Sequence, residues 1–408
     1  MNDYNVVLAT DNNYLPYSFV ACQSIIDSLE SPSDGGQTVS NDDRIIFNLI
    51  VDNSVNTDIL KEKCQSFTNR NKDKIAISFE IKHVDPNLFA GAPKLKGSHS
   101  TYYRIVVDKL LDKDIDTILY IDVDILVRKD IRKLFNQTNL QGSVLAACVE
   151  HAIDENYIPD SKLNIKPDTP FKKPLIINKH EYFNAGVLLI NLNEWRAQNI
   201  SDKCLEILKS YSPRAHDQDL LNYTIKNKVI LDMGWNFHTF NFFLKFNDKD
   251  NRYSLIPLRG NGKTNLSCKN DLPDAETFEQ IANDPAICHF TLFKPWERME
   301  CHYSNLPTTY NMGKYLLEWH AEAAKVAEFA IELSSLSHVD IRNYDFIDCL
   351  LNHKISVNQQ NINKLIKGRK KDKKVLVSAI ACLAVVEVIT LTFQIITPQT
   401  TMYHQCHL

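Results

Sequence analysis

Residues 118–127 read Ile-Leu-Tyr-Ile-Asp-Val-Asp-Ile-Leu-Val, an apolar run that is interrupted only by two aspartates. A run of this kind, rich in β-branched residues, is typical of a buried parallel strand that delivers two carboxylates at its carboxyl end. Ionised aspartate is almost never fully buried unless it is paired or holds a metal ion. Asp122 and Asp124 are therefore either a cation site at a sheet edge or a polar strand end bonded to loop amides. These three residues alone leave both alternatives open.

The overall composition sets the class of protein. With 408 residues the chain exceeds one ordinary core, which predicts a main domain and an appendage. A formal net charge of −4 predicts no nucleic-acid partner. The ten cysteines include no C-x-x-C pair, which favours reduced thiols and a cytoplasmic location. The first residues form no basic and apolar leader, so we expect no secretion signal.

Strand and helix patterns alternate in the first part of the chain. Apolar strands are predicted at residues 5–10, 45–51 and 75–84, with helices at 19–29 and 57–67 between them. This β-α-β-α-β order predicts a parallel sheet with right-handed crossovers.

The pattern continues beyond the aspartate run. Helices are expected at 100–111, from Asn193 as N-cap, and from His216; strands are expected at 144–149, 183–192, 229–233 and 286–290. The connections at 151–182 and 247–284 have little periodicity. A connection of such length is a lid, a binding loop or a disordered piece.

The C-terminal part changes texture. We therefore expect a main domain at 1–305, a helical region at 306–366 and a tail at 367–408, where a basic run (367–374) precedes an apolar segment (375–396). That segment is long enough to span a bilayer, but Glu387 near its centre costs about 2.5–3.5 kcal/mol on insertion. A C-terminal anchor, a surface-docked helix and a buried helix remain open. If the segment is an anchor or a surface-docked helix, the basic run on the side of the main domain predicts that this domain lies at the inner face of the membrane.

Polar residues stand at the ends of several apolar strands: Asp11 with Asn13, the aspartate pair, Asn184, and His289. In open parallel α/β sheets, ligands bind beyond the carboxyl ends of the strands. Two carboxylates and an imidazole suit Mn²⁺ or Mg²⁺, which commonly bridge phosphate oxygens. The glycine-rich phosphate loops G-x-x-x-x-G-K-[ST] and G-x-G-x-x-G are absent from the sequence. We therefore expect a metal ion, helped by Lys294, to neutralise a nucleotide diphosphate.

Taken together and in order, these motifs resemble the family 8 retaining glycosyltransferases of the bacterial lipopolysaccharide galactosyl- and glucosyltransferase type. The matching motifs are Leu-Ala-Thr-Asp-Asn-Asn-Tyr at 8–14, Thr-Tyr-Tyr-Arg at 101–104, Asp-Val-Asp at 122–124, Phe-Asn-Ala-Gly-Val at 183–187, Asp-Gln-Asp at 217–219, and His289 with Lys-Pro-Trp at 294–296. The resemblance implies the α/β GT-A fold, a Rossmann-like mixed sheet flanked by helices, here followed by a helical C-terminal appendage.

The resemblance also implies roles for individual residues. Asp122, Asp124 and His289 would bind Mn²⁺, with Mg²⁺ as the alternative. Around this ion, the family pattern implies uracil and ribose contacts from Ala9, Asp11 and Asn13, a diphosphate contact from Lys294, and donor-sugar contacts from Arg104, Asn184, Asp217 and Gln218. The chain departs from the family between His289 and Lys294, where Thr291-Leu292-Phe293 replaces the usual glycine-containing turn.

The expected reaction is transfer of a hexose, galactose or glucose, from a UDP-sugar to lipopolysaccharide or another lipid-linked glycan. Retention requires a covalent intermediate on Asp217 or Asp219, or attack from the front face with Gln218 stabilising the sugar cation, which we favour. Three other functions stay open: glycogenin-like glucosylation of a protein, nucleotidyl transfer, and glycan binding without catalysis. The absence of Gly, Lys and Arg from residues 5–20 speaks against a nucleotidyltransferase.

Overall fold

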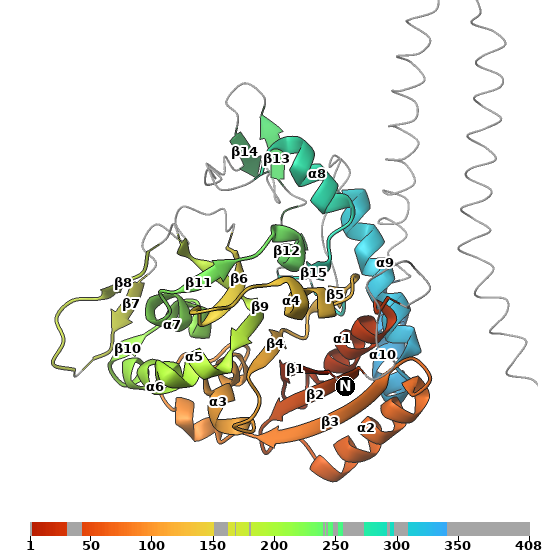
Figure 1. Ribbon diagram of the computed structural model, residues 1–408, viewed down its shortest axis with the longest axis horizontal. Coiled ribbons are helices and arrows are strands. Elements are labelled where there is room, and N and C mark those ends of the chain that lie inside the picture. Colours follow the sequence, from red (N-terminus) through yellow and green to blue (C-terminus); the bar gives the residue numbers. More distant parts are fainter. Residues whose placement is uncertain are drawn as a thin grey trace, which may run out of the picture. The chain divides into compact units, whose positions relative to one another are not determined.

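The computed structural model describes residues 2–30, 43–150, 162–167, 169–178, 181–239, 241, 244–247, 252–255, 273–291, 294–297 and 309–340 (Figure 1). Met1–Cys301 and Asn311–Arg342 form one compact unit. Nearly all of the second unit, His302–Tyr310 with Asn343–Leu408, lies outside the described residues. The basic run and the apolar segment fall there, so the predicted boundaries at 305 and 366 stay predictions.

A seven-stranded mixed sheet forms the centre of the first unit. Its order is β11-β6-β9-β4-β1-β2-β3. The strands are β1 (Asp3–Ala9), β2 (Arg44–Val51), β3 (Ala76–His83), β4 (Thr117–Ile121), β6 (Leu145–Val149), β9 (Phe183–Asn191) and β11 (Lys228–Ile230). Strands β1 to β4 are parallel, as the βα alternation predicts, but β9 runs antiparallel to both of its neighbours, β4 and β6. The expected mixed sheet is confirmed.

Helices cover both faces of the sheet (Figure 1). On one face, Phe19 of α1 (Leu15–Asp27) and Phe67 of α2 (Thr57–Asn71) form an aromatic cluster with Phe47 of β2. The other face packs against η3 (Ser100–Val106), α3 (Val107–Leu110), α5 (Leu192–Ala197), α6 (Ile200–Ser210) and α7 (His216–Thr224). Buried Trp195 and Tyr102 lie in that second cluster, so the sheet is apolar on both sides.

The aspartate run is not one strand, which corrects the expectation from its apolar pattern. It is split into β4 and a short β5 (Ile125–Val127), which belongs to a second sheet of order β12-β15-β5 with β12 (Phe237–His238) and β15 (Ile287–His289). At the break, Asp122 N donates to Gly186 O at 2.8 Å, and Phe290 N donates to Asp124 O at 2.9 Å. Both aspartates therefore lie on a bend that passes from one sheet to the other.

Two expectations about helices are also corrected. The segment 100–111 is mostly the tighter 3₁₀ helix η3, followed by the one-turn helix α3. The N-cap of α5 is Asn191, whose Oδ1 accepts from Glu194 N at 3.2 Å, instead of Asn193. Asn193 was expected because it follows the apolar run, but Leu192 already has helical backbone.

The long connections carry small strands. Within 151–182 and near it lie β7 (Lys162–Ile165), β8 (Leu175–Ile176) and β10 (Tyr211–Ser212), which form a three-stranded sheet. The second connection contains a hairpin of β13 (Leu244–Asn247) and β14 (Arg252–Leu255), followed by α8 (Ala275–Asn283). The short helix α4 (Arg132–Gln137) follows β5.

The described C-terminal part is helical, with α9 (Thr309–Lys325) and α10 (Ala330–Asp340). Tyr315 and Trp319 of α9 are fully buried in the first unit. In the part of the chain that the structure describes, no helix combines the length and the apolar character that crossing a membrane requires.

Candidate active site

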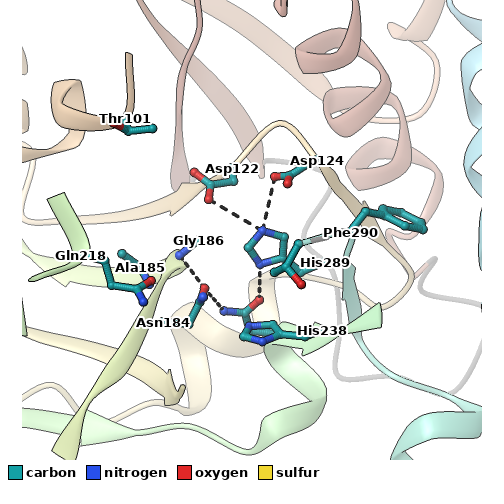
Figure 2. A network of polar contacts seen from close by, with 12 residues as sticks. Thr101, Asp122, Asp124, Asn184, Ala185, Gly186, Gln218, His238, His289 and Phe290 are labelled. Carbon is teal, nitrogen blue, oxygen red and sulfur yellow. Dashed lines mark hydrogen bonds and ion pairs between the residues drawn. The ribbon is translucent and has the colours of Figure 1, made fainter. Parts of the chain in front are cut away.

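The site lies where the ends of four segments meet: β4, β9, α7 and β15. Because β9 is antiparallel to β4, its first residues lie beside the carboxyl end of β4, with Val187 paired to Ile121. The antiparallel direction of β9 also explains why Asn184, at the start of this strand, lies beside residues that stand at the carboxyl ends of β4 and β15. Figure 2 shows Asp122, Asp124 and His289 converging from the bend and from β15.

The two aspartates and the histidine form a compact ligand set. One ligand atom from each of Asp122, Asp124 and His289 lies within 4.8 Å of the other two. His289 Nε2 is 3.3 Å from Asp124 Oδ1 and 3.8 Å from Asp122 Oδ2 (Figure 2). Register places these groups together, because β5 pairs antiparallel with β15 and sets Ile125 opposite His289. Carboxylate and imidazole donors at this spacing fit a divalent metal ion.

Lys294 contacts the same ligand set. Its ammonium group donates to Asp124 Oδ2 and to the carbonyl oxygens of Phe290 (2.7 Å) and Thr291 (3.1 Å). Burial alone would raise the pKa of Asp124, but the ammonium group of Lys294 and the neighbouring His289 outweigh burial and hold that pKa well below its usual range. Asp124 is therefore a carboxylate throughout the physiological range, and a cation already neutralises it.

Arg104 connects the metal ligands to the helix α7. Its Nη2 donates to Asp122 Oδ1 at 2.7 Å, and its Nε lies 2.9 Å from Asp217 Oδ2. The guanidinium stacks over the ring of Tyr120, with 4.3 Å to the centroid. Burial would lower the pKa of Arg104, but the two carboxylates outweigh it and raise the pKa. The sequence-predicted donor-site residues Arg104 and Asp217 are thus in direct contact.

Asp217 is 4% exposed, at the start of α7. Burial is the main cause that raises its pKa to about 7, and the nearby charge of Asp122 adds to it, while Arg104 opposes it. A carboxyl group in this range gains or loses its proton near neutral pH, which is a property of many groups in active sites.

Gln218 and Asn184 meet at a glutamate that the sequence analysis did not identify. Gln218 Oε1 accepts from Ala185 N at 2.9 Å, and its Nε2 donates to Glu150 Oε2 at 3.2 Å. Asn184 Nδ2 donates to the same oxygen at 2.7 Å. Glu150 follows the apolar strand β6, so the rule that singled out polar residues at strand ends would have found it.

The predicted nucleotide residues lie at the end of β1. Asp11 Oδ1 accepts from Asn13 N at 3.0 Å and from Tyr14 N at 3.2 Å, a turn that begins α1. A pocket between β1, η3 and the bend is lined by Ala9, Thr10, Tyr14, Leu95, Lys96, Ser98, Ser100, Thr101, Arg104, Tyr120, Asp122, Val123, Asp124, Lys294 and Trp296. Of the described residues predicted to contact the nucleotide, Ala9 and Lys294 line this pocket. Asp11 and Asn13 do not line it and instead form the hydrogen-bonded turn before α1.

Asn236 is a second residue that sequence analysis missed. It lies in the 3₁₀ turn η5 (Met233–Asn236), is 3% exposed, and its Oδ1 is 2.9 Å from His289 Nδ1. No periodicity marks this position. Only the parallel pairing of β12 with β15, which sets His238 beside His289, brings it to the site.

Known proteins with similar sequences include General stress protein A of Bacillus subtilis, 28% identical over 56% of this chain and 70% of that protein. The lipopolysaccharide 1,3-galactosyltransferase of Salmonella typhimurium is 28% identical over 36% of this chain and 42% of that enzyme. The chain spans about half the length of several relatives, including 49% of the Streptococcus pneumoniae glycosyltransferase GlyB.

Solved structures with this fold include the bifunctional glycosyltransferase WbbM, with a TM-score of 0.56 at 17% identity over 82% of this chain and 51% of that chain. The galactosyltransferase LgtC, solved in complex with donor and acceptor sugar analogs, has a TM-score of 0.50 at 22% identity over 79% of this chain and 96% of that chain. Residues 5–300 match glycosyl transferase family 8. The chain therefore belongs to glycosyl transferase family 8 and has the GT-A fold of these structures.

Proposed function

We propose that the protein is a metal-dependent, retaining hexosyltransferase that moves galactose or glucose from a UDP-sugar to a glycan acceptor. The observation that carries the proposal is the convergence of Asp122, Asp124 and His289 Nε2 within 4.8 Å, beside Arg104 and Gln218. Membership of family 8 supports the reaction class.

Asp122, Asp124 and His289 would hold Mn²⁺, or Mg²⁺ in its place. The set of two carboxylates and an imidazole, in which Asp124 and His289 are buried, fits such an ion, since Asp124 is held as a carboxylate. When bound, the ion supplies positive charge that stabilises the leaving UDP. Lys294 adds a positive charge at the same oxygens, because its ammonium group already lies against Asp124 beside the pocket.

The remaining residues bind and orient the donor. Ala9, Asp11 and Asn13, at the end of β1, are proposed to contact uracil and ribose. Arg104 and Asn184 are proposed to bind the hexose hydroxyl groups. Both are buried and already held in place, Arg104 by two carboxylates and Asn184 by Glu150, so little side-chain order is lost on binding.

For the chemical step we propose attack from the front face. The bond from the anomeric carbon to the β-phosphate oxygen breaks, the acceptor oxygen bonds to the same face of that carbon, and the acceptor proton passes to the leaving phosphate. Gln218 stabilises the positive sugar through its amide oxygen, which Ala185 N holds in place. An amide is a poor nucleophile, so a covalent intermediate would have to form on Asp217 or Asp219.

The proposed acceptor is lipopolysaccharide or another lipid-linked oligosaccharide. The names of two relatives, the 1,3-galactosyltransferase and a lipopolysaccharide 1,2-glucosyltransferase of Escherichia coli, support this class. A protein at the inner face of the membrane, held there through residues 367–396, would meet such an acceptor.

UDP release from a panel of UDP-sugars, with and without Mn²⁺, tests the proposal. We expect metal-dependent release, including slow hydrolysis without an acceptor, and a loss of about 100-fold or more for Asp124→Ala. Asp58→Ala removes an exposed carboxylate of α2 and serves as the matched control. The proposal fails if no UDP-sugar is turned over and Asp124→Ala binds UDP as tightly as the wild type.

A further inference from the structure

We infer that Asn236 is a positioning residue: it holds the His289 imidazole with Nδ1 protonated, so that Nε2 keeps its lone pair free for the proposed metal position beside Asp122 and Asp124. This inference rests on the metal site proposed above and deepens it. Asn236 touches neither the donor pocket nor the carboxylates, and acts through His289.

A chain of side-chain hydrogen bonds leads from the protein interior to His289. Glu150 Oε2 accepts from Asn184 Nδ2 at 2.7 Å. Asn184 Oδ1 accepts from Gly186 N and from Asn236 Nδ2, each at 2.8 Å. Asn236 Oδ1 then lies 2.9 Å from His289 Nδ1. Figure 2 shows this run from Gly186 through Asn184 towards His289.

The backbone N–H of Gly186 decides which group donates and which accepts in each of these hydrogen bonds. A backbone N–H can only donate, so Gly186 N requires the oxygen of Asn184, not its nitrogen, at that position. An oxygen there requires Asn236 to present its NH₂ group to Asn184 and its own oxygen to His289. An amide oxygen only accepts, so His289 must carry a proton on Nδ1. In a neutral imidazole the free lone pair is then on Nε2, the atom that faces both aspartates.

The ring itself has little room to rotate. A Cβ at Gly186 would lie 2.2 Å from His289 Cε1, so the backbone of β9 presses against one side of the ring. The ring of His238 meets it edge to face, with 5.3 Å between the centroids. His289 and Asn236 are each 3% exposed, and Asn184 is 6% exposed, so this hydrogen-bonded group is buried.

The hydrogen bond between Asn236 and His289 should affect the affinity for Mn²⁺. Metal-bound histidines depend on the partner of their other ring nitrogen, and loss of that partner typically costs 10- to 100-fold in metal affinity. We therefore expect Asn236→Leu, which keeps the side-chain size but has no acceptor, to bind Mn²⁺ roughly 10- to 100-fold more weakly than the wild type.

The first experiment needs no variant. Nitrogen NMR of the metal-free, full-length protein with ¹⁵N-labelled histidine reports which ring nitrogen carries the proton, with His289 assigned from His289→Gln. At a pH at which the spectrum shows the His289 ring to be neutral, we expect the Nδ1–H form. A predominant Nε2–H form would overturn the inference.

The second experiment measures Mn²⁺ affinity by the electron paramagnetic resonance signal of the free ion. Asn236→Asp keeps an acceptor for Nδ1–H and should stay within a few-fold of the wild type, whereas Asn236→Leu should show the full loss. Asn71→Leu removes a buried amide of α2 that bonds Gln23 and Phe67, and controls for lost stability. Thermal unfolding of all three variants checks that each is folded.

The outcomes separate the inference from the proposed function. If wild-type protein binds no Mn²⁺, the proposed metal site fails, while the NMR measurement still tests the Nδ1–H form. If the wild type binds Mn²⁺ and the folded Asn236→Leu protein binds it equally well, the inference fails and the proposed function stands. Equal losses in Asn236→Leu and Asn71→Leu would also overturn the inference.

Discussion

At the scale of single residues, the site depends on one position that has no side chain. Gly186 lies between His289 and Asp122, two of the proposed metal ligands: a Cβ there would be 2.2 Å from His289 Cε1 and 2.9 Å from Asp122 Oδ2. Real Cβ atoms do not approach other atoms so closely, and both neighbours are held by further contacts. The glycine of the Phe-Asn-Ala-Gly-Val motif is thus required by the packing of the ligand set.

Gly186→Ala tests this requirement. The added methyl group should displace His289 or Asp122, lower Mn²⁺ affinity by roughly tenfold or more, and cost about 1–3 kcal/mol of unfolding free energy through overpacking. Metal titration and chemical denaturation measure the two effects. Gly142→Asn is the control, because that turn glycine has φ +69°, which Asn tolerates, and no atom near its missing Cβ. Unchanged metal affinity in Gly186→Ala would contradict the expected displacement.

Asp217 predicts a pH dependence of stability. Burial raises its pKa from 3.8 to about 7 in the folded protein. A group whose pKa is higher in the folded than in the unfolded state contributes stability that is complete below the unfolded pKa and is lost as pH rises through the folded pKa. The free energy of unfolding of the wild type should therefore fall between about pH 4 and pH 7, relative to Asp217→Asn, by an amount on the order of 4 kcal/mol at most.

Denaturant unfolding of both proteins across this pH range measures the difference. Asn mimics the neutral carboxyl group, so its curve should lack the fall that Asp217 causes. Two curves that stay parallel from pH 4 to pH 7 would show that Asp217 keeps an ordinary carboxylate pKa in the fold.

At the scale of elements, short strands and one aromatic stack position the chemistry. β5 and β15 contain three residues each, yet their pairing brings Asp124 and His289 together. After β15 the chain returns to the site, and Trp296 stacks on Tyr17 of α1 with centroids 3.8 Å apart and planes at 4°. Trp319 of α9 lies 5.6 Å from Trp296. Two helices thus hold the segment that carries Lys294.

Trp296→Ala should release this segment. Because Lys294 would no longer be held beside Asp124, we expect the KM for the UDP-sugar to rise, by roughly tenfold at most for a stacking contact of this kind, with a smaller change in kcat. Trp296→Phe keeps a ring for the stack and should stay near the wild type. Steady-state kinetics decides, and an unchanged KM in Trp296→Ala would show that Lys294 does not depend on the stack.

At the scale of the whole molecule, the helical region after residue 305 contributes to the first compact unit. Tyr315 Oη donates to the carbonyl oxygens of Ala282 (3.0 Å) and Asn283 (2.7 Å) at the end of α8. Glu318 accepts from Arg128 Nε at 2.7 Å, beside β5. Trp319 is fully buried. Helix α9 therefore contacts the residue that follows β5 and the end of α8, which precedes β15 in the chain.

Truncation compares the predicted boundary at 305 with the end of the compact unit at Arg342. A chain that ends at 305 exposes the surface that Tyr315 and Trp319 cover, so its melting temperature should fall strongly or the protein should aggregate. A chain that ends at 342 should melt close to the full-length protein. Equal melting temperatures for all three chains would show that α9 adds nothing to stability.

The tail predicts binding to membranes. If the tail meets an anionic membrane, residues 367–374 would contribute about 1 kcal/mol per Lys or Arg, and residues 375–396 would supply apolar area. The full-length protein should co-sediment with vesicles that contain anionic lipid, and a chain that ends at 366 should not. Release by salt alone would exclude a spanning anchor, and the absence of any vesicle binding would contradict the membrane prediction.

Local sequence patterns were sufficient for much of the fold. The periodicity of apolar residues located β1, β2, β3 and α1, α2, and the polar residues at strand ends marked Asp122, Asp124, Asn184 and His289. Such patterns work because burial of one face or two faces leaves a period of 3.6 or 2 in the sequence. They also placed α7 at His216, where acidic residues favour a helix start.

What the sequence alone determined is therefore the βα order of the first part of the chain, most of the polar residues of the candidate site, and the family. The tertiary structure decided the reversal of β9, the split of the aspartate run between two sheets, and the contacts of Glu150 and Asn236 with the site. The physical reason is that direction and register are set by packing between segments far apart in the chain. The pattern of neighbouring residues in the sequence predicts whether a side chain is buried. Which side chain it contacts is decided only by the pairing of the strands.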